Sequence, residues 1–151
     1  MRDPVEEILT TARTVAMVGL SPDPQRWSYR VAEYLRRHGY RVIPVNPTVA
    51  CVLGERAYPT LRAIPQPVDV VTIFRSLEHV PGVVDAAVAI GARAIWMPEG
   101  VRHERAAARA EAAGILVVMD RCMKQEHERL LRADLVPEED GARVHRPQVR
   151  P

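Results

Sequence analysis

The chain has 151 residues, 47% of them hydrophobic and 26% charged, which is the ordinary balance of one globular domain. Its 21 Lys and Arg residues against 19 Asp and Glu give a net charge of +2, too balanced for a dedicated nucleic-acid surface. No apolar run approaches the roughly 18 residues of a membrane span, and the N-terminus lacks the apolar core of a signal peptide. We therefore expect a cytoplasmic protein with no nucleic-acid or membrane partner.

The first third of the chain alternates helix and strand signals. A short helix is predicted to begin at Asp3-Pro4, because Asp3 can cap it and proline suits its first position. The apolar run 15–18 predicts a buried strand, and 40–45 predicts a second strand. The helix between them ends at His38-Gly39. The residues expected on its apolar face are Trp27, Val31, Tyr34 and Leu35.

The same unit recurs through the rest of the chain. Further strands are predicted over 68–74, 94–97 and 115–119, and helices over 80–90, 103–113 and 123–133. Alternating strands and helices imply right-handed crossovers and a parallel sheet covered on both faces. The predicted fold class is therefore α/β, a three-layer Rossmann-like domain with about five parallel strands. Whether 49–56 adds an edge strand stays open.

The domain is expected to span residues 1–133. Residues 134–151 are polar and form a predicted C-terminal tail. The two cysteines, Cys51 and Cys122, lie far apart and form no CxxC pair, which suits a reducing cytoplasm and argues against a zinc ribbon.

The loop after the first strand has the chemistry of a phosphate site. In an open parallel sheet, ligands lie outside the carboxyl ends of the strands. Gly19 lets the backbone approach a phosphate, and the following helix offers free N–H groups. Ser21, Arg26 and Ser28 could add donors. The loop is not a GxGxxG fingerprint, so a strand-to-helix turn without a ligand is the alternative.

The loop after the second strand argues against a nicotinamide cofactor. Asn46-Pro47-Thr48 lacks the acidic residue that binds the ribose of NAD. The third strand ends in Ile73-Phe74-Arg75, an apolar pair followed by a cation. The fourth ends in Met97-Pro98-Glu99-Gly100, a turn that brings backbone close to a neighbour.

Several motifs of this chain occur together, in the same order, in one known family. They are Val18-Gly19-Leu20-Ser21, Ser28-Tyr29-Arg30-Val31-Ala32, Val42-Ile43-Pro44-Val45-Asn46-Pro47, Phe74-Arg75, Trp96-Met97-Pro98-Glu99-Gly100-Val101 and Val118-Met119-Asp120-Arg121-Cys122. Over residues 10 to 127 the chain thus resembles the small stand-alone CoA-binding proteins. That family is similar to the N-terminal CoA-binding domain of the succinyl-CoA synthetase alpha subunit.

The resemblance implies coenzyme A held across the strand ends. By this resemblance, Gly19, Leu20 and Ser21 lie by the phosphates, and Asn46 and Pro47 lie by the adenosine end. Ile73, Phe74 and Arg75 line the middle of the ligand. Met97, Pro98 and Glu99 lie by adenine or pantetheine. Thr48 stands where relatives often carry a phosphate-binding lysine, and Arg26, Arg30 or Arg56 could substitute for it.

No residue is assigned a catalytic or metal-binding role. Cys122 is the best candidate for a reactive thiol, but a small buried side chain is the favoured interpretation. The five histidines show no spacing typical of a nucleophile and its base, and most are expected on helix surfaces: His38, His79, His103, His127 and His145.

The sequence therefore predicts non-catalytic binding of coenzyme A or an acyl-CoA, with an apolar clasp from Ile73 and Phe74. The alternative is a nucleotide-dependent enzyme, either an NAD(P)-type oxidoreductase or a CoA-ligase component that needs a partner chain. A regulatory role through a protein partner, or a homo-oligomer, also stays open.

Overall fold

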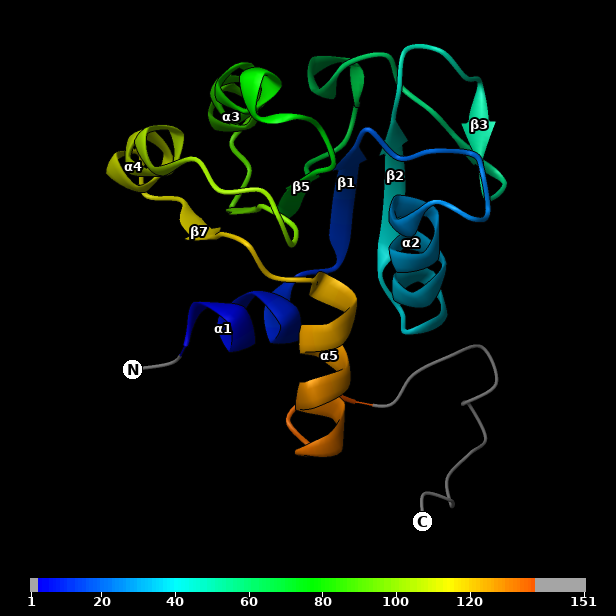
Figure 1. Cartoon of the computed structure of the whole chain (residues 1–151), viewed down its shortest axis with the longest axis vertical. Coiled ribbons are helices and arrows are strands. Elements are labelled where there is room, and N and C mark those ends of the chain that lie inside the picture. Colours follow the sequence, from blue (N-terminus) through cyan, green and yellow to red (C-terminus); the bar gives the residue numbers. More distant parts are fainter. Residues whose placement is uncertain (1–2, 138–151) are drawn as a thin grey trace.

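The structure, a computed structural model, describes residues 3–137. Five parallel strands form one sheet in the order β2-β1-β5-β6-β7 (Figure 1). Their bounds are β1 (Thr14–Val18), β2 (Arg41–Val45), β5 (Val70–Ile73), β6 (Ala94–Trp96) and β7 (Leu116–Val118). The predicted Rossmann-like α/β architecture with five parallel strands is confirmed.

Helices cover both faces of this sheet. The first face carries α1 (Pro4–Thr11), α2 (Trp27–Arg37) and α5 (Met123–Arg132), and the second carries α3 (Val80–Ala89) and α4 (Glu104–Ala112). Each face has its own apolar core, because successive strand residues point to opposite sides. Val15 and Met17 of β1 pack under the first group of helices, whereas Ala16 and Val18 pack under the second.

The helix termini follow the local sequence. The Asp3 carboxylate accepts a hydrogen bond from the Val5 N–H, and Pro4 occupies the first turn of α1. The His103 Nδ1 accepts a hydrogen bond from the Ala106 N–H and caps α4. No helix within residues 3–137 is long and apolar enough to cross a lipid bilayer.

One local feature differs from the sequence prediction, and another answers a question that the sequence left open. Trp27 was expected on the buried face of α2, but it is the first residue of that helix and is 41% exposed. The open question at 49–56 resolves as a separate antiparallel hairpin of β3 (Cys51–Val52) and β4 (Glu55–Arg56). Beyond it, Tyr58 forms a parallel bridge with Val45 of β2.

The chain stays packed past the end of α5. The Leu135 N–H donates to the Leu130 carbonyl, and Val136 is buried in the core of the first face. The rest of the predicted tail, from residue 138, lies outside the described residues.

A buried histidine joins α5 to α2. His127 is 1% exposed, so the expectation of a helix-surface histidine is wrong for this residue. Its Nδ1 lies 2.8 Å from the Tyr34 hydroxyl, and its ring packs edge-on against those of Tyr34, His38 and Tyr40. Burial, reinforced by the nearby His38, lowers the pKa of His127 from 6.5 to about 4. Burial also raises the pKa of Tyr34, so its hydroxyl stays protonated beside the neutral His127.

This cluster predicts an acid-dependent loss of stability. Between pH 6.5 and 4 the unfolded chain protonates His127 and the folded chain does not, so stability falls as the pH falls. Between pH 7 and pH 5 we expect this histidine to cost about 2 kcal/mol of unfolding free energy. Urea denaturation of the wild type and of His127→Gln measures it, because glutamine keeps an acceptor for Tyr34 but does not titrate. An equal loss in both proteins would contradict the assignment.

Candidate functional site

The sheet topology creates a crevice between β1 and β5. The loop after β1 leads to α2 on one face, whereas the loop after β5 leads to α3 on the other (Figure 1). Diverging loops at such a switch point leave room for a ligand at the carboxyl ends of the strands. A cleft of about 630 Å³ lies there. It is lined by six of the residues predicted from sequence: Gly19, Arg26, Asn46, Pro47, Phe74 and Arg75.

The cleft is basic. Arg26, Arg75 and the half-exposed His79 contribute to its lining, which contains no carboxylate. Within residues 3–137 no carboxylate forms an ion pair with either arginine, whereas His79 lies 3.5 Å from its neighbour Glu78. Two unpaired guanidinium groups in a concave surface favour an anionic ligand.

Gly19 brings the ends of three strands together. Its N–H donates to the Val45 carbonyl at 2.9 Å, and the Phe74 N–H donates to the Val18 carbonyl at 2.8 Å. Gly19 has φ +88, and a Cβ there would lie 2.2 Å from the Phe74 carbonyl oxygen and 3.1 Å from Arg75 Cδ. The glycine is therefore required by the protein's own backbone, and it lets the Arg75 side chain lie across the end of β1.

Asn46 holds two loops of the site together. Its Nδ2 donates to the Leu20 carbonyl at 2.9 Å, and its Oδ1 accepts from the N–H and the hydroxyl of Thr48. These bonds hold the loop that brings Asn46, Pro47 and Thr48 to the lining of the cleft.

The two serines of the first loop also order the backbone. The Ser28 hydroxyl oxygen accepts from the Ser21 N–H at 3.1 Å, and the Ser21 hydroxyl oxygen accepts from the Asp23 N–H at 3.0 Å. Ser21 and Ser28 do not line the cleft. Arg26 does, and it precedes α2, whose N-terminus has no side-chain cap.

The remaining predicted residues lie outside the cleft. Glu99 is exposed and Pro98 is buried. The others are fully buried core residues: Leu20, Ile73 and Met97. Ile73 packs on the face of α3 and α4, so the expected clasp of Ile73 and Phe74 is reduced to Phe74, which does line the cleft.

Sequence reasoning missed one wall of the cleft. This wall comes from the segment before β5 and from the start of α3: Pro59, Thr60, Leu61, His79, Gly82, Val83 and Ala86. The lining residues at the start of α3 are three or four positions apart, as on one face of a helix, and they follow Arg75 in the sequence. This spacing is a signal that could have identified them. The segment 59–61 carries no such pattern. Within the described part of the chain, no group of three His, Cys, Asp or Glu side chains could hold a metal ion.

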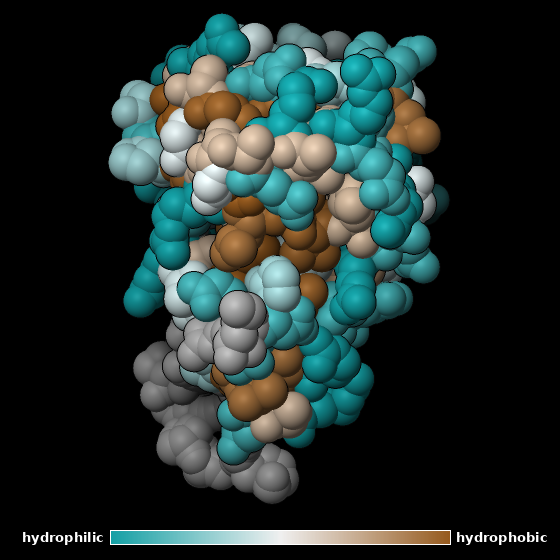
Figure 2. Space-filling model, turned by 90° about the vertical axis from the view of Figure 1, so that its left-hand side faces the viewer, coloured by the Kyte–Doolittle hydropathy of each residue, from teal (hydrophilic) through white to brown (hydrophobic). Residues whose placement is uncertain are grey.

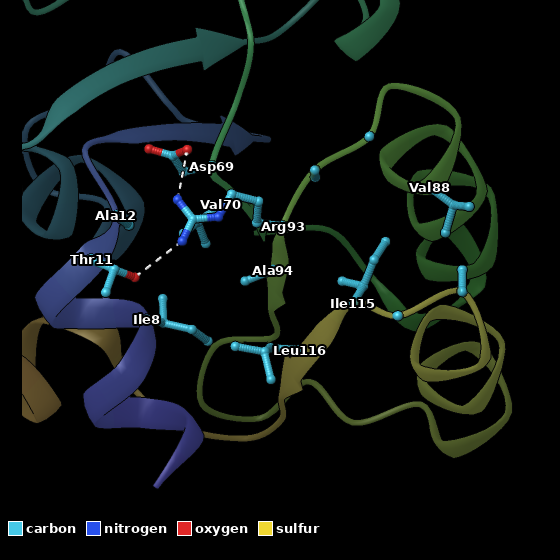
Figure 3. Close-up of a pocket in the computed structure, with 14 residues that line it drawn as sticks. Ile8, Thr11, Ala12, Asp69, Val70, Val88, Arg93, Ala94, Ile115 and Leu116 are labelled. Carbon is cyan, nitrogen blue, oxygen red and sulfur yellow. Dashed lines mark hydrogen bonds and ion pairs between the residues drawn. The ribbon is translucent and has the colours of Figure 1, made fainter. Parts of the chain in front are cut away.

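A second cavity, of about 420 Å³, lies at the opposite edge of the sheet and differs in its chemistry (Figure 3). Its one arginine, Arg93, is bound to the Asp69 carboxylate at 3.3 Å and to the Thr11 hydroxyl at 3.4 Å. One of its lining residues, Leu116, is 39% exposed. Figure 2 shows a face of the molecule on which apolar side chains gather.

Asp69 is a structural group of that edge. Its partial burial favours the neutral acid, but hydrogen bonds from the Arg13 and Thr14 N–H groups and the charge of Arg93 outweigh this and lower the pKa of Asp69. The cation of the second cavity is thus neutralised by a carboxylate, whereas Arg26 and Arg75 in the cleft at the carboxyl edge have no such partner within residues 3–137.

Comparison with known proteins agrees with this geometry. The model of the family described as CoA binding domain matches residues 13–128. The chain belongs to this CoA-binding domain family. The uncharacterized protein YneT of Bacillus subtilis (strain 168) is 37% identical over 123 residues, which are 82% of this chain and 91% of that protein.

Solved structures support the family and its fold. A hypothetical protein from Pyrococcus horikoshii OT3 is 40% identical with a TM-score of 0.81, over 84% of this chain and 89% of that one. A dinucleotide-forming acetyl-coenzyme A synthetase 1 of Ca. Korarchaeum cryptofilum is 25% identical with a TM-score of 0.65. That match covers 75% of this chain but 27% of the synthetase, so this CoA-binding domain resembles one part of a larger enzyme.

The Gly19 contact predicts that this position governs folding. Gly19→Ala should lower the unfolding free energy by about 3 kcal/mol or more, because left-handed strain adds to a clash with backbone. Gly114→Ala is the matched control, since Gly114 has φ +86 but no atom within 4 Å of an added Cβ. It should cost only about 1–2 kcal/mol. Equal losses in urea denaturation would contradict the contact with Phe74.

Proposed function

We propose that this protein binds coenzyme A or an acyl-CoA in the cleft at the carboxyl ends of β1, β2 and β5, without turning it over. The observation that carries the proposal is the unpaired cationic lining, Arg26 and Arg75, beside Gly19 at the switch point. A CoA molecule carries several phosphate charges, and this cleft has no carboxylate to repel them. Membership of the CoA-binding domain family favours this anion over other nucleotides.

The phosphates lie at the end of the cleft nearest Gly19. There the Arg75 side chain lies beside the glycine, and Arg26 stands immediately before α2. Two guanidinium groups together stabilise a diphosphate through charge-assisted hydrogen bonds. Arg26 and Arg75 thereby take over the role of the lysine that Thr48 replaces.

The lining of the cleft offers little for catalysis. The lining contains one histidine, His79, and no thiol or carboxylate stands beside it there. Cys122 is 4% exposed and Glu99 lies outside the cleft. Acyl transfer needs an activated nucleophile and a positioned acid or base, so we infer that the chain is a binding protein. Two free cysteines are compatible with the cytoplasm that we assign to it.

The second candidate is a component of a CoA ligase whose partner chain supplies the catalytic groups. It rests on the likeness to part of the Korarchaeum synthetase. In that case a partner would add acyl-CoA turnover to a chain that has none alone. Incubation of the purified chain with acetyl-CoA, with and without ADP and phosphate, measures turnover by the chain alone through the release of free thiol. Neither a binding protein nor a ligase component without its partner should release any, so turnover would contradict both.

Titration calorimetry tests the binding proposal. We expect heat with CoA and none with NAD, because Asn46 replaces the acid that would hold the NAD ribose. Arg26→Gln and Arg75→Gln should each weaken CoA binding by about tenfold, since each removes one charge-assisted contact.

Arg109→Gln is the matched control for these variants. Arg109 is paired with Asp85 on the outside of α3 and α4, 2.8 Å away, and it does not line the cleft. CoA affinity should therefore be unchanged. NAD binding without CoA binding, or equal losses in all three variants, would overturn the proposal.

A further inference from the structure

Gly82 lies in a helix at a position where nothing in the fold requires a glycine. It is the third residue of α3, it is exposed, and its φ is not left-handed. A Cβ added there would have no atom within 4 Å. Glycine is a poor helix former compared with alanine, so this position gives up stability without a packing gain. Gly19 differs, because its own backbone neighbours require the missing side chain.

Gly82 lies in the lining of the cleft. Ala86, one helical turn further along α3, lines the same cleft, as does Val83 beside it. Because Gly82 lines the cleft together with Val83 and Ala86, we expect the added methyl of an alanine at 82 to narrow the cleft. The open space beside Gly82 is not part of the protein core, since Gly82 is exposed.

The two ends of the cleft differ in chemistry. Arg75 lies over Gly19 and marks the phosphate end. The wall of α3 and the segment before β5 are mostly uncharged and apolar, with Leu61, Val83 and Ala86 in the lining. A flat aromatic base suits such a wall, because it buries apolar area and needs close approach to a surface without side chains.

We infer that Gly82 is a specificity-determining residue, which lets the adenine base of the ligand lie against the backbone of α3. This inference rests on the proposed CoA binding. The base then stacks beside Val83 and Ala86, while the diphosphate extends toward Arg75. The pantetheine arm leaves the cleft and makes no contact with Gly82.

The test is Gly82→Ala, with two readouts that move in opposite directions. The melting temperature should rise by about 1–3 °C, because alanine favours the helix. The dissociation constant for CoA should rise by roughly fivefold to a hundredfold, because the methyl overlaps the base. Adenosine 3′,5′-bisphosphate, which lacks the pantetheine arm, should lose the same factor. A variant that is more stable yet binds less cannot be explained by misfolding.

Ala108→Gly is the matched control, on the exposed side of α4 and outside the lining of the cleft. It should lower the melting temperature and leave CoA affinity unchanged. Wild-type binding of CoA with unchanged affinity in Gly82→Ala overturns the inference alone. A loss for CoA but none for the bisphosphate also overturns it, because the arm and not the base would then lie at Gly82. If the wild type binds no CoA, the proposed function itself fails.

Discussion

The approach of Gly19 to the Phe74 carbonyl oxygen determines the shape of the carboxyl edge of the sheet. A Cβ at Gly19 would lie 2.2 Å from that oxygen, so β1 and β5 can end side by side only with a glycine at this point. The loop after β1 leads to α2 on one face of the sheet, and the loop after β5 leads to α3 on the other. The cleft is the space between these two loops. A phosphate-binding loop also needs a glycine, but here the fold itself already requires one at Gly19.

The cleft brings together two arginines that have no carboxylate partner in the described part of the chain. Several arginines on other parts of the described surface do have one, such as Arg36 with Glu55, Arg93 with Asp69 and Arg109 with Asp85. Arg26 and Arg75 have none within residues 3–137, and both face the same concave space. Exposed ion pairs contribute little to stability, so the missing partners of Arg26 and Arg75 bear on the charge of the cleft more than on the stability of the fold. An anion is the chemical complement of that arrangement.

The fold was predictable because its signals are local and repeated. Apolar runs ended by glycine marked the strands, and the absence of the ribose-binding acid at Asn46 was visible directly.

Burial was harder to predict. Ile73 and Met97 stand in the right loops but point into the core, since the two-residue period of a strand decides which face a side chain meets. His127 was expected at the surface because its partners, Tyr34 and His38, are about 90 residues away in sequence. Gly82 was overlooked because the wall that it lines forms only when α3 packs beside β5.

The central claim is that CoA occupies the carboxyl edge of the sheet and leaves the apolar cavity at the amino edge empty. Backbone amide chemical shifts, followed by two-dimensional NMR of the labelled protein during titration with CoA, test it directly. We expect the amide signals of Gly19, Thr48 and Gly82 to move in a saturable way, whereas those of Arg93 and Leu116 at the amino edge stay in place. Saturable shifts confined to Arg93 and Leu116, or no saturable shift at all, would contradict it.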